Sequence, residues 1–320
     1  MAGDFTYLPY SIAMVVSEYL LMIKAMLVWT ARRDEARLRS TRHSCRTQQE
    51  ARRWLSVFDQ RSFASCSGGL YGRGSSLLLL TTRLTSALFF VVIGMGFNFA
   101  RPEVHGHWQY FTNWNVGLIS GYYTLATAAS AYFVNQCQVH GWPHDSDPST
   151  TALLLSRLDS PRLRTAGTFL SVYFCVASVT AIFVTTVNFV LLDPAPRFYN
   201  MTAHLFTSLS FMVEMSLNCV QLKKNEVVIN MSWIMLWMSF IWPIVYFGVK
   251  PDWPYDFLDS STPAIFAWFQ LLFIVYFLIY LGWHAIAEWK LNKYASDWLV
   301  SSSGQIDVCD KPYESLVSEI

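Results

Sequence analysis

Six long apolar stretches alternate with short polar connections between residues 77 and 289. Each stretch is close to the roughly 20 residues that an α-helix needs to cross the hydrocarbon core of a bilayer. The stretches are Leu77–Ala100, Thr112–Asn135, Phe169–Leu192, Asn200–Gln221, Val227–Val249 and Ala264–Trp289. The pattern predicts an all-α fold, a multi-pass transmembrane helical bundle with six core spans.

More polar segments flank this predicted six-span membrane bundle of residues 77–289. Residues 1–31 carry apolar side chains on one helical arc and polar side chains on the other, which predicts an amphipathic helix in the inner interface or a seventh span. The pattern leaves open whether residues 8–30 cross the bilayer. Residues 32–76 read as an Arg-rich cytosolic segment, and residues 290–320 read as a cytosolic tail.

Composition and charge favour the same interpretation. Only 14% of the residues are charged, against about 25% in soluble domains. Eighteen Lys and Arg residues fall in one set of connections, whereas the other set holds only Arg101, Arg197 and Lys250. The positive-inside rule places the richer side in the cytosol. We therefore expect an integral multi-pass protein of the endoplasmic reticulum or plasma membrane, with a cytosolic C-terminus.

The expected partners are membrane lipids, since a net charge of +1 gives no reason to expect nucleic acid. The sequence does not indicate any protein partner. None of the six cysteines falls in an outer connection, and no Cys-x-x-Cys pattern occurs. The sequence therefore predicts no disulfide framework, no metal site and no cofactor.

Three of the ionisable residues inside the predicted spans are candidates for function or pairing. They are Arg83 in the first span and His204 and Glu214 in the fourth. A charged side chain in the bilayer core has a high free-energy cost, so such groups face a protein interior or a water-filled cavity and pair with another group there. Arg83 is a candidate partner for Glu214. Glu214 lies ten residues, or about 15 Å, beyond His204 and is too far inward to contact it.

The predicted topology brings Thr112 and His204 to a similar depth. The second and fourth spans both run inward from the outer side, and these two residues lie near their outer ends. A hydroxyl becomes a nucleophile when a base takes its proton, and imidazole is the usual base at neutral pH. The spacing alone is equally compatible with a threonine bonded to its own helix and a structural histidine.

Two short motifs carry a resemblance to a known family. Tyr110-Phe111-Thr112-Asn113-Trp114-Asn115 opens a span, and Asn200-Met201-Thr202-Ala203-His204 opens another that continues to Glu214-Met215. This pair resembles the androgen-induced protein family, which includes the androgen-dependent TFPI-regulating protein, and the form of the first motif looks closest to its rolling stone-like branch. The resemblance covers residues 77 to 289.

The resemblance implies a membrane hydrolase of fatty acid esters of hydroxy fatty acids. Carried over by position, Thr112 is the nucleophile and His204 the general base. Asn115 is then a candidate oxyanion donor and Asn200 a candidate for orienting the imidazole, although both also suit helix caps or interhelical hydrogen bonds. The Arg-rich segment is not part of the family's core. The alternative is a non-enzymatic rolling stone-like protein in cell fusion, adhesion or scaffolding.

Overall fold

The described part of the chain is helical throughout. The structure is a computed structural model. It describes residues 73–95, 110–142, 160–192, 201–218, 222–223, 226–246, 255–258 and 264–303, with the single residues 24, 158 and 220. Every regular element in these ranges is a helix, which confirms the all-α fold class. The helix expected in residues 1–31 and most of segment 32–76 lie outside the described residues.

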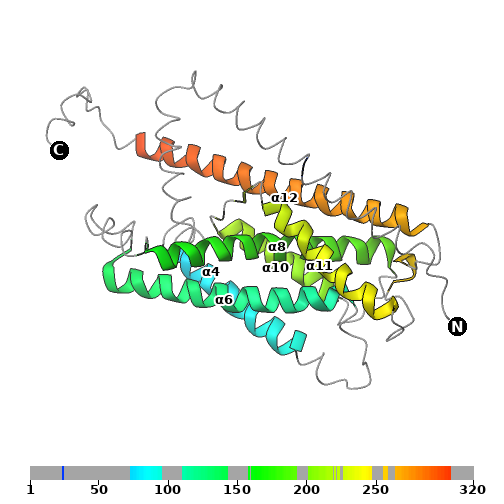
Figure 1. The fold of residues 1–320 in the computed structure, drawn as a ribbon. Helices are drawn as coiled ribbons and strands as arrows, with labels where there is room; N and C mark the ends of the chain where they lie inside the picture. Colours follow the sequence, from blue (N-terminus) through cyan, green and yellow to red (C-terminus); the bar gives the residue numbers. More distant parts are fainter. Residues whose placement is uncertain are drawn as a thin grey trace.

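A helix lies on each of the six apolar stretches. The elements are α4 (Arg73–Phe89) with the π-helical η1 (Phe90–Met95), α6 (Phe111–His140), α8 (Pro161–Leu191), the π-helical η3 (Met201–Phe206) with α10 (Thr207–Leu217), α11 (Glu226–Tyr246), the 3₁₀ helix η4 (Asp256–Leu258) and α12 (Ala264–Ser303). They form an elongated bundle in which α12 runs along one side of α8, and α6 and α4 run along the other (Figure 1).

Three helices of the described ranges are long and apolar enough to cross a membrane. They are Arg73–Val92, Pro161–Leu191 and Ala264–Lys293, and Glu226–Ile241 is a shorter apolar helix. The structure is therefore compatible with a membrane protein. These three helices do not establish six spans, so the six-span topology stays a prediction. Helix α10 has only 11 residues, and α6 carries many small and polar side chains.

Local sequence signals explain where two of the helices begin and end. The side chain of Ser160 accepts a hydrogen bond from the backbone N–H of Leu163 at 3.4 Å, and Pro161 occupies the first helical position of α8. A serine cap followed by proline is a common helix start, since proline has no N–H to leave unsatisfied. Gly141 ends α6 with φ of 86°, a conformation that glycine adopts without strain.

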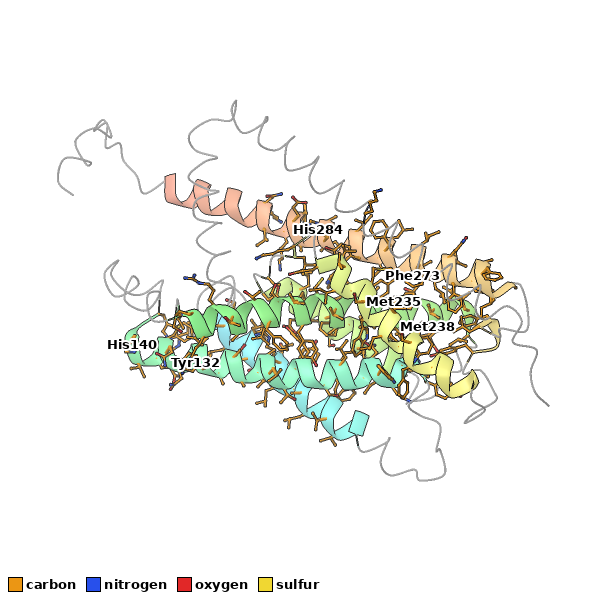
Figure 2. The ribbon with its side chains drawn as sticks, viewed as in Figure 1. Tyr132, His140, Met235, Met238, Phe273 and His284 are labelled. Atoms are coloured by element: carbon orange, nitrogen blue, oxygen red, sulfur yellow. The ribbon has the colours of Figure 1, made fainter. Side chains whose placement is uncertain are left out.

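The core is built mainly from aromatic and aliphatic side chains of α6, α8, α10, α11 and α12. The rings of Tyr122, Phe174 and Phe211 are completely or almost completely buried and pack with centroids 5.5 to 5.8 Å apart. Toward α12, Met238 belongs to the same cluster, with Met235 and Phe273 packed against it (Figure 2). Aromatic pairs at such distances contribute beyond the area that they bury.

A charged pair lies inside this core. Nε and Nη2 of Arg83 on α4 donate to Oε1 of Glu214 on α10 at 2.9 and 2.5 Å, and both side chains are at most 1% exposed. Nη1 donates to the hydroxyl of Ser130 at 2.6 Å and to the carbonyl of Ala126 at 3.4 Å. The Tyr122 hydroxyl also donates to Glu214. The predicted pairing of Arg83 with Glu214 is confirmed, and it joins α4, α6 and α10.

A lysine fixes α12 to the end of α10. Nζ of Lys290 donates to the backbone carbonyls of Met215 and Asn218 at 2.5 and 2.6 Å. Cations are stabilising at helix C-termini, where several carbonyls lack intrahelical partners. Helix α12 continues to Ser303 and so includes residues 290–303, which the sequence assigned to the tail. The helical backbone at Lys290 is what holds its side chain against α10.

We predict that Arg83→Met strongly destabilises the protein, because it leaves the Glu214 carboxylate buried without its cation. Breaking a buried pair typically costs about 3–5 kcal/mol. The thermal midpoint of the purified protein in detergent should fall clearly, whereas Arg162→Met at the exposed start of α8 should change it little. The double variant Arg83→Met/Glu214→Leu should recover part of the loss. Equal midpoints for Arg83→Met and Arg162→Met would contradict this role.

Candidate functional site

His204 lies in the π-helical segment η3, at the start of the helical stretch that continues as α10. Its side chain is only 6% exposed. The Nδ1 atom of the imidazole is fully buried and has no hydrogen-bond partner among the described residues. η3 packs against α6 and α8. An imidazole nitrogen without a partner is available to accept or donate a proton.

The backbone around His204 is held by hydroxyl groups. Thr185 of α8 and Thr207 of α10 each donate a hydrogen bond to the carbonyl oxygen of His204, at 2.5 and 2.6 Å. The Thr185 hydroxyl is also 2.6 Å from the hydroxyl of Ser208. π-helical turns inside α-helical stretches are rare and occur frequently at functional sites. The hydroxyls fix the position of this turn against α8.

Contacts deeper in the bundle indicate which residues of α6 lie level with His204 along the bundle axis. Tyr123 of α6 stacks on Phe211 of α10 with ring centroids 5.2 Å apart. Both helices run in the same direction, because each runs opposite to α4. Arg83 contacts Ala126 of α6 and Glu214 of α10, whereas Phe90 contacts Ser120 and Phe89 contacts Phe206. Seven residues before Phe211 is His204, and seven before Tyr123 is Val116. The imidazole therefore lies level with the first two turns of α6, which include Thr112.

The structure does not join Thr112 directly to His204. The Thr112 side chain is partly exposed, and the ring of Tyr255 packs beside it, against Tyr110 at the start of α6. Neither of the two described side chains, Thr112 or His204, hydrogen-bonds to the other. The register of α6 and α10 is compatible with the predicted similar depth of Thr112 and His204. A direct hydrogen bond between these two side chains would need a side-chain rearrangement.

Two buried amides lie near the start of α6 and near the end of α8. Asn115, one turn after Thr112, is 0% exposed, and neither atom of its amide has a partner among the described residues. Asn188 is 5% exposed, lies one turn beyond Thr185 on α8 and has an unpartnered Nδ2. Sequence reasoning selected Asn115 but missed Asn188. The signal for Asn188 is an amide near the outer end of a stretch of Val, Thr, Phe and Leu.

The group of Thr112, Asn115 and His204, near the first two turns of α6, is called the outer polar layer below. An unpartnered buried amide costs about 1–3 kcal/mol, so the Asn115 amide is unfavourable in a purely structural arrangement. Asn200, the predicted orienting residue, lies outside the described residues. Chemically, the layer offers a hydroxyl, an imidazole and an amide near the start of α6.

The chain was compared with protein-family models, with curated proteins and with solved structures, and it matches none of them. The resemblance to the androgen-induced protein family therefore stays an expectation that depends on two short motifs. The function has to be argued from the residues of the outer polar layer and from their surroundings.

We predict that Asn115→Leu keeps or raises the thermal midpoint, because a side chain of similar volume removes two buried polar atoms that have no partner. The matched control is Asn230→Leu on α11. Nδ2 of Asn230 donates to Cys175 Sγ and to the Glu226 carbonyl, and the Tyr276 hydroxyl donates to its Oδ1, each at 3.1 Å. This control should lower the midpoint. A larger loss for Asn115→Leu than for Asn230→Leu would show that the Asn115 amide is structural.

Proposed function

We propose that the protein is an intramembrane lipid ester hydrolase, in which Thr112 is the nucleophile and His204 is the general base. The observation that carries the proposal is the buried Nδ1 of His204, which has no partner among the described residues and whose helix packs beside the first two turns of α6. A base without a competing partner is free to take the proton of a hydroxyl that reaches it. The partial exposure of Thr112 gives a substrate access to the hydroxyl.

The reaction proceeds in two balanced stages. Thr112 Oγ1 attacks the ester carbonyl carbon, its proton passes to His204, and the carbonyl π electrons move to the oxygen. The tetrahedral intermediate then collapses, the bond to the leaving alkoxide breaks, and the imidazolium returns the proton to that alkoxide. Water, deprotonated by the same imidazole, cleaves the acyl-threonine and releases the fatty acid. His204 ends each cycle neutral.

The setting favours a lipid substrate. Apolar side chains cover much of the outer surfaces of α4, η1, α10 and α12, and the large exposed ones include Leu88, Val92, Val213, Ile274 and Leu278. Such a surface is compatible with lipid contact on the membrane-facing sides. The charge asymmetry of the connections favours a position of the outer polar layer beneath the non-cytosolic leaflet. Fatty acid esters of hydroxy fatty acids are the substrate class that we propose, in the endoplasmic reticulum or plasma membrane.

We predict that Thr112→Ala and His204→Ala each abolish hydrolysis of these esters by membranes that contain the protein. Loss of an activated nucleophile or its base removes the covalent step, so the rate should fall at least about a hundredfold. A fluorophosphonate probe should label wild-type Thr112, as mapped by mass spectrometry, and the labelling should be much slower in His204→Ala.

The control variants replace the same residue types elsewhere. Thr124→Ala on α6 removes a hydroxyl that donates to the carbonyl of Ser120 at 2.8 Å. His284→Ala removes an imidazole from the middle of α12, where Figure 2 places it. Both should keep wild-type turnover. If all four variants hydrolyse the esters like wild type, the catalytic assignment is wrong. If membranes with the wild-type protein hydrolyse no more ester than membranes without it, a non-enzymatic role in cell fusion, adhesion or scaffolding takes its place.

A further inference from the structure

Asn188 and His204 lie on facing surfaces of α8 and η3. The Thr185 hydroxyl of α8 donates to the His204 carbonyl at 2.5 Å and is 2.6 Å from the Ser208 hydroxyl. Residues three or four apart share a face of a helix. Asn188 therefore shares the face of Thr185 on α8, and His204 shares the face of Ser208 on the opposite segment. Both side chains belong to one contact between helices.

The directions of the two segments bring these side chains to a similar level. α8 runs opposite to the η3–α10 stretch, because Phe174 packs on Phe211 with centroids 5.8 Å apart, whereas Thr185 bonds to the carbonyl of His204. Asn188 lies three residues, or about 4.5 Å, beyond Thr185 and toward the start of η3. Cα–Cβ bonds tilt toward the N-terminus of a helix. The side chains of Asn188 and His204 therefore tilt toward each other along the bundle.

Both side chains are buried, and each has a polar atom that needs a partner. Asn188 is 5% and His204 6% exposed. Nδ2 of Asn188 and Nδ1 of His204 have no hydrogen-bond partner among the described residues, so the two do not bond to each other. Phe189 and Val190, the next residues of α8, are 40% and 72% exposed, which indicates that Asn188 faces the interior. A substrate oxygen beside the imidazole would give the amide its acceptor.

We propose that Asn188 is the oxyanion donor of the hydrolase, and that its Nδ2 donates to the ester oxygen on which negative charge develops. This inference rests on the proposed function. Oxyanion donors are groups that are already in place and free of other acceptors when the charge forms. Burial holds the Asn188 amide against η3, and no described group accepts from its Nδ2.

Asn188 is tied to the proposed base more directly than Asn115, the donor that the sequence suggests. Hydrogen bonds of Thr185 join the helix face of Asn188 to the segment that carries His204. Asn115 lies on α6, and its level relative to His204 follows from ring packing deeper in the bundle. A donor fixed in the same helix contact as the base keeps its position relative to the group that takes the proton.

Asn188 acts while the tetrahedral intermediate exists. Thr112 Oγ1 attacks the carbonyl carbon, its proton passes to His204, and the π electrons move to the carbonyl oxygen, which accepts from Asn188 Nδ2. When the intermediate collapses, this electron pair forms the carbonyl again, the bond to the alkoxide breaks, and the imidazolium gives the alkoxide its proton. Asn188 keeps its own protons throughout, so it stabilises the intermediate without entering the proton balance.

The first test is Asn188→Leu, which has a similar volume and no N–H. Loss of one oxyanion donor should lower kcat for the ester about 100-fold to 1000-fold in purified protein, with KM little changed. Fluorophosphonate labelling of Thr112 should slow by a similar factor, because the P=O oxygen of the probe takes the place of the carbonyl oxygen. The thermal midpoint should stay or rise, since Nδ2 has no partner in the described ranges. Asn135→Leu, at an exposed position of α6, is the control and should match wild type.

Asn188→Asp separates an oxyanion donor from a residue that orients the imidazole. A carboxylate can accept a hydrogen bond from imidazole, but it has no proton to donate to an oxyanion. We expect Asn188→Asp to lose at least as much kcat as Asn188→Leu. An orienting residue would instead lose activity as Asn188→Leu and keep it as Asn188→Asp, and this outcome would overturn the inference.

The remaining outcomes separate the inference from the proposed function. If Thr112→Ala is inactive and Asn188→Leu keeps the wild-type kcat, the inference fails while the proposed function stands. A midpoint of Asn188→Leu that falls as far as that of Asn230→Leu would make the amide structural and would also overturn the inference. If wild type and Thr112→Ala behave alike, the proposed function fails, and the inference falls with it.

Discussion

The buried ion pair of Arg83 and Glu214 is the constraint on which the rest of the bundle depends. Two charges taken out of water are stable only if each finds a partner of opposite sign and further hydrogen bonds. Here the guanidinium also reaches Ser130 and the carboxylate also accepts from Tyr122. A buried pair contributes little net stability over apolar residues of the same size. Its effect is to select one axial alignment of α4, α6 and α10.

That alignment determines which residues share the outer polar layer. Helices α6 and α10 run in the same direction, and the contacts of Glu214 and Phe211 hold them in one register. A shift of α10 by one turn would move the imidazole of His204 by about 5 Å along the bundle and away from the level of Asn115. The ion pair and the proposed site are thus connected through a rigid helix, although they lie in different layers.

The sequence predicts the fold class well because helical periodicity and span length are local properties. It also predicts the pairing of Arg83 with Glu214, since they are the buried cation and anion available in those stretches. It does not predict that Tyr255 packs against the beginning of α6, nor that Asn188 is buried. Tyr255 stands in a connection, whose path depends on the packing around it, and the orientation of Asn188 depends on how α8 is rotated against its neighbours. At the π-helical turn, the carbonyl of His204 accepts from Thr185 of α8 and from Thr207 of its own helical stretch, and the sequence does not show the first of these contacts.

The unpartnered amide of Asn115 is not a sign of loose packing, because the same bundle satisfies a comparable amide elsewhere. Asn230 has three hydrogen-bond partners on α8, α11 and α12. Glu214 retains an unpartnered Oε2 and Asn218 an unpartnered Nδ2 among the described residues, but Oε1 of Glu214 and Oδ1 of Asn218 are bonded. Neither amide atom of Asn115 has a partner in the described part of the chain. Local rules are broken in natural proteins chiefly at functional sites, and this amide stands one turn from the hydroxyl for which we propose catalysis.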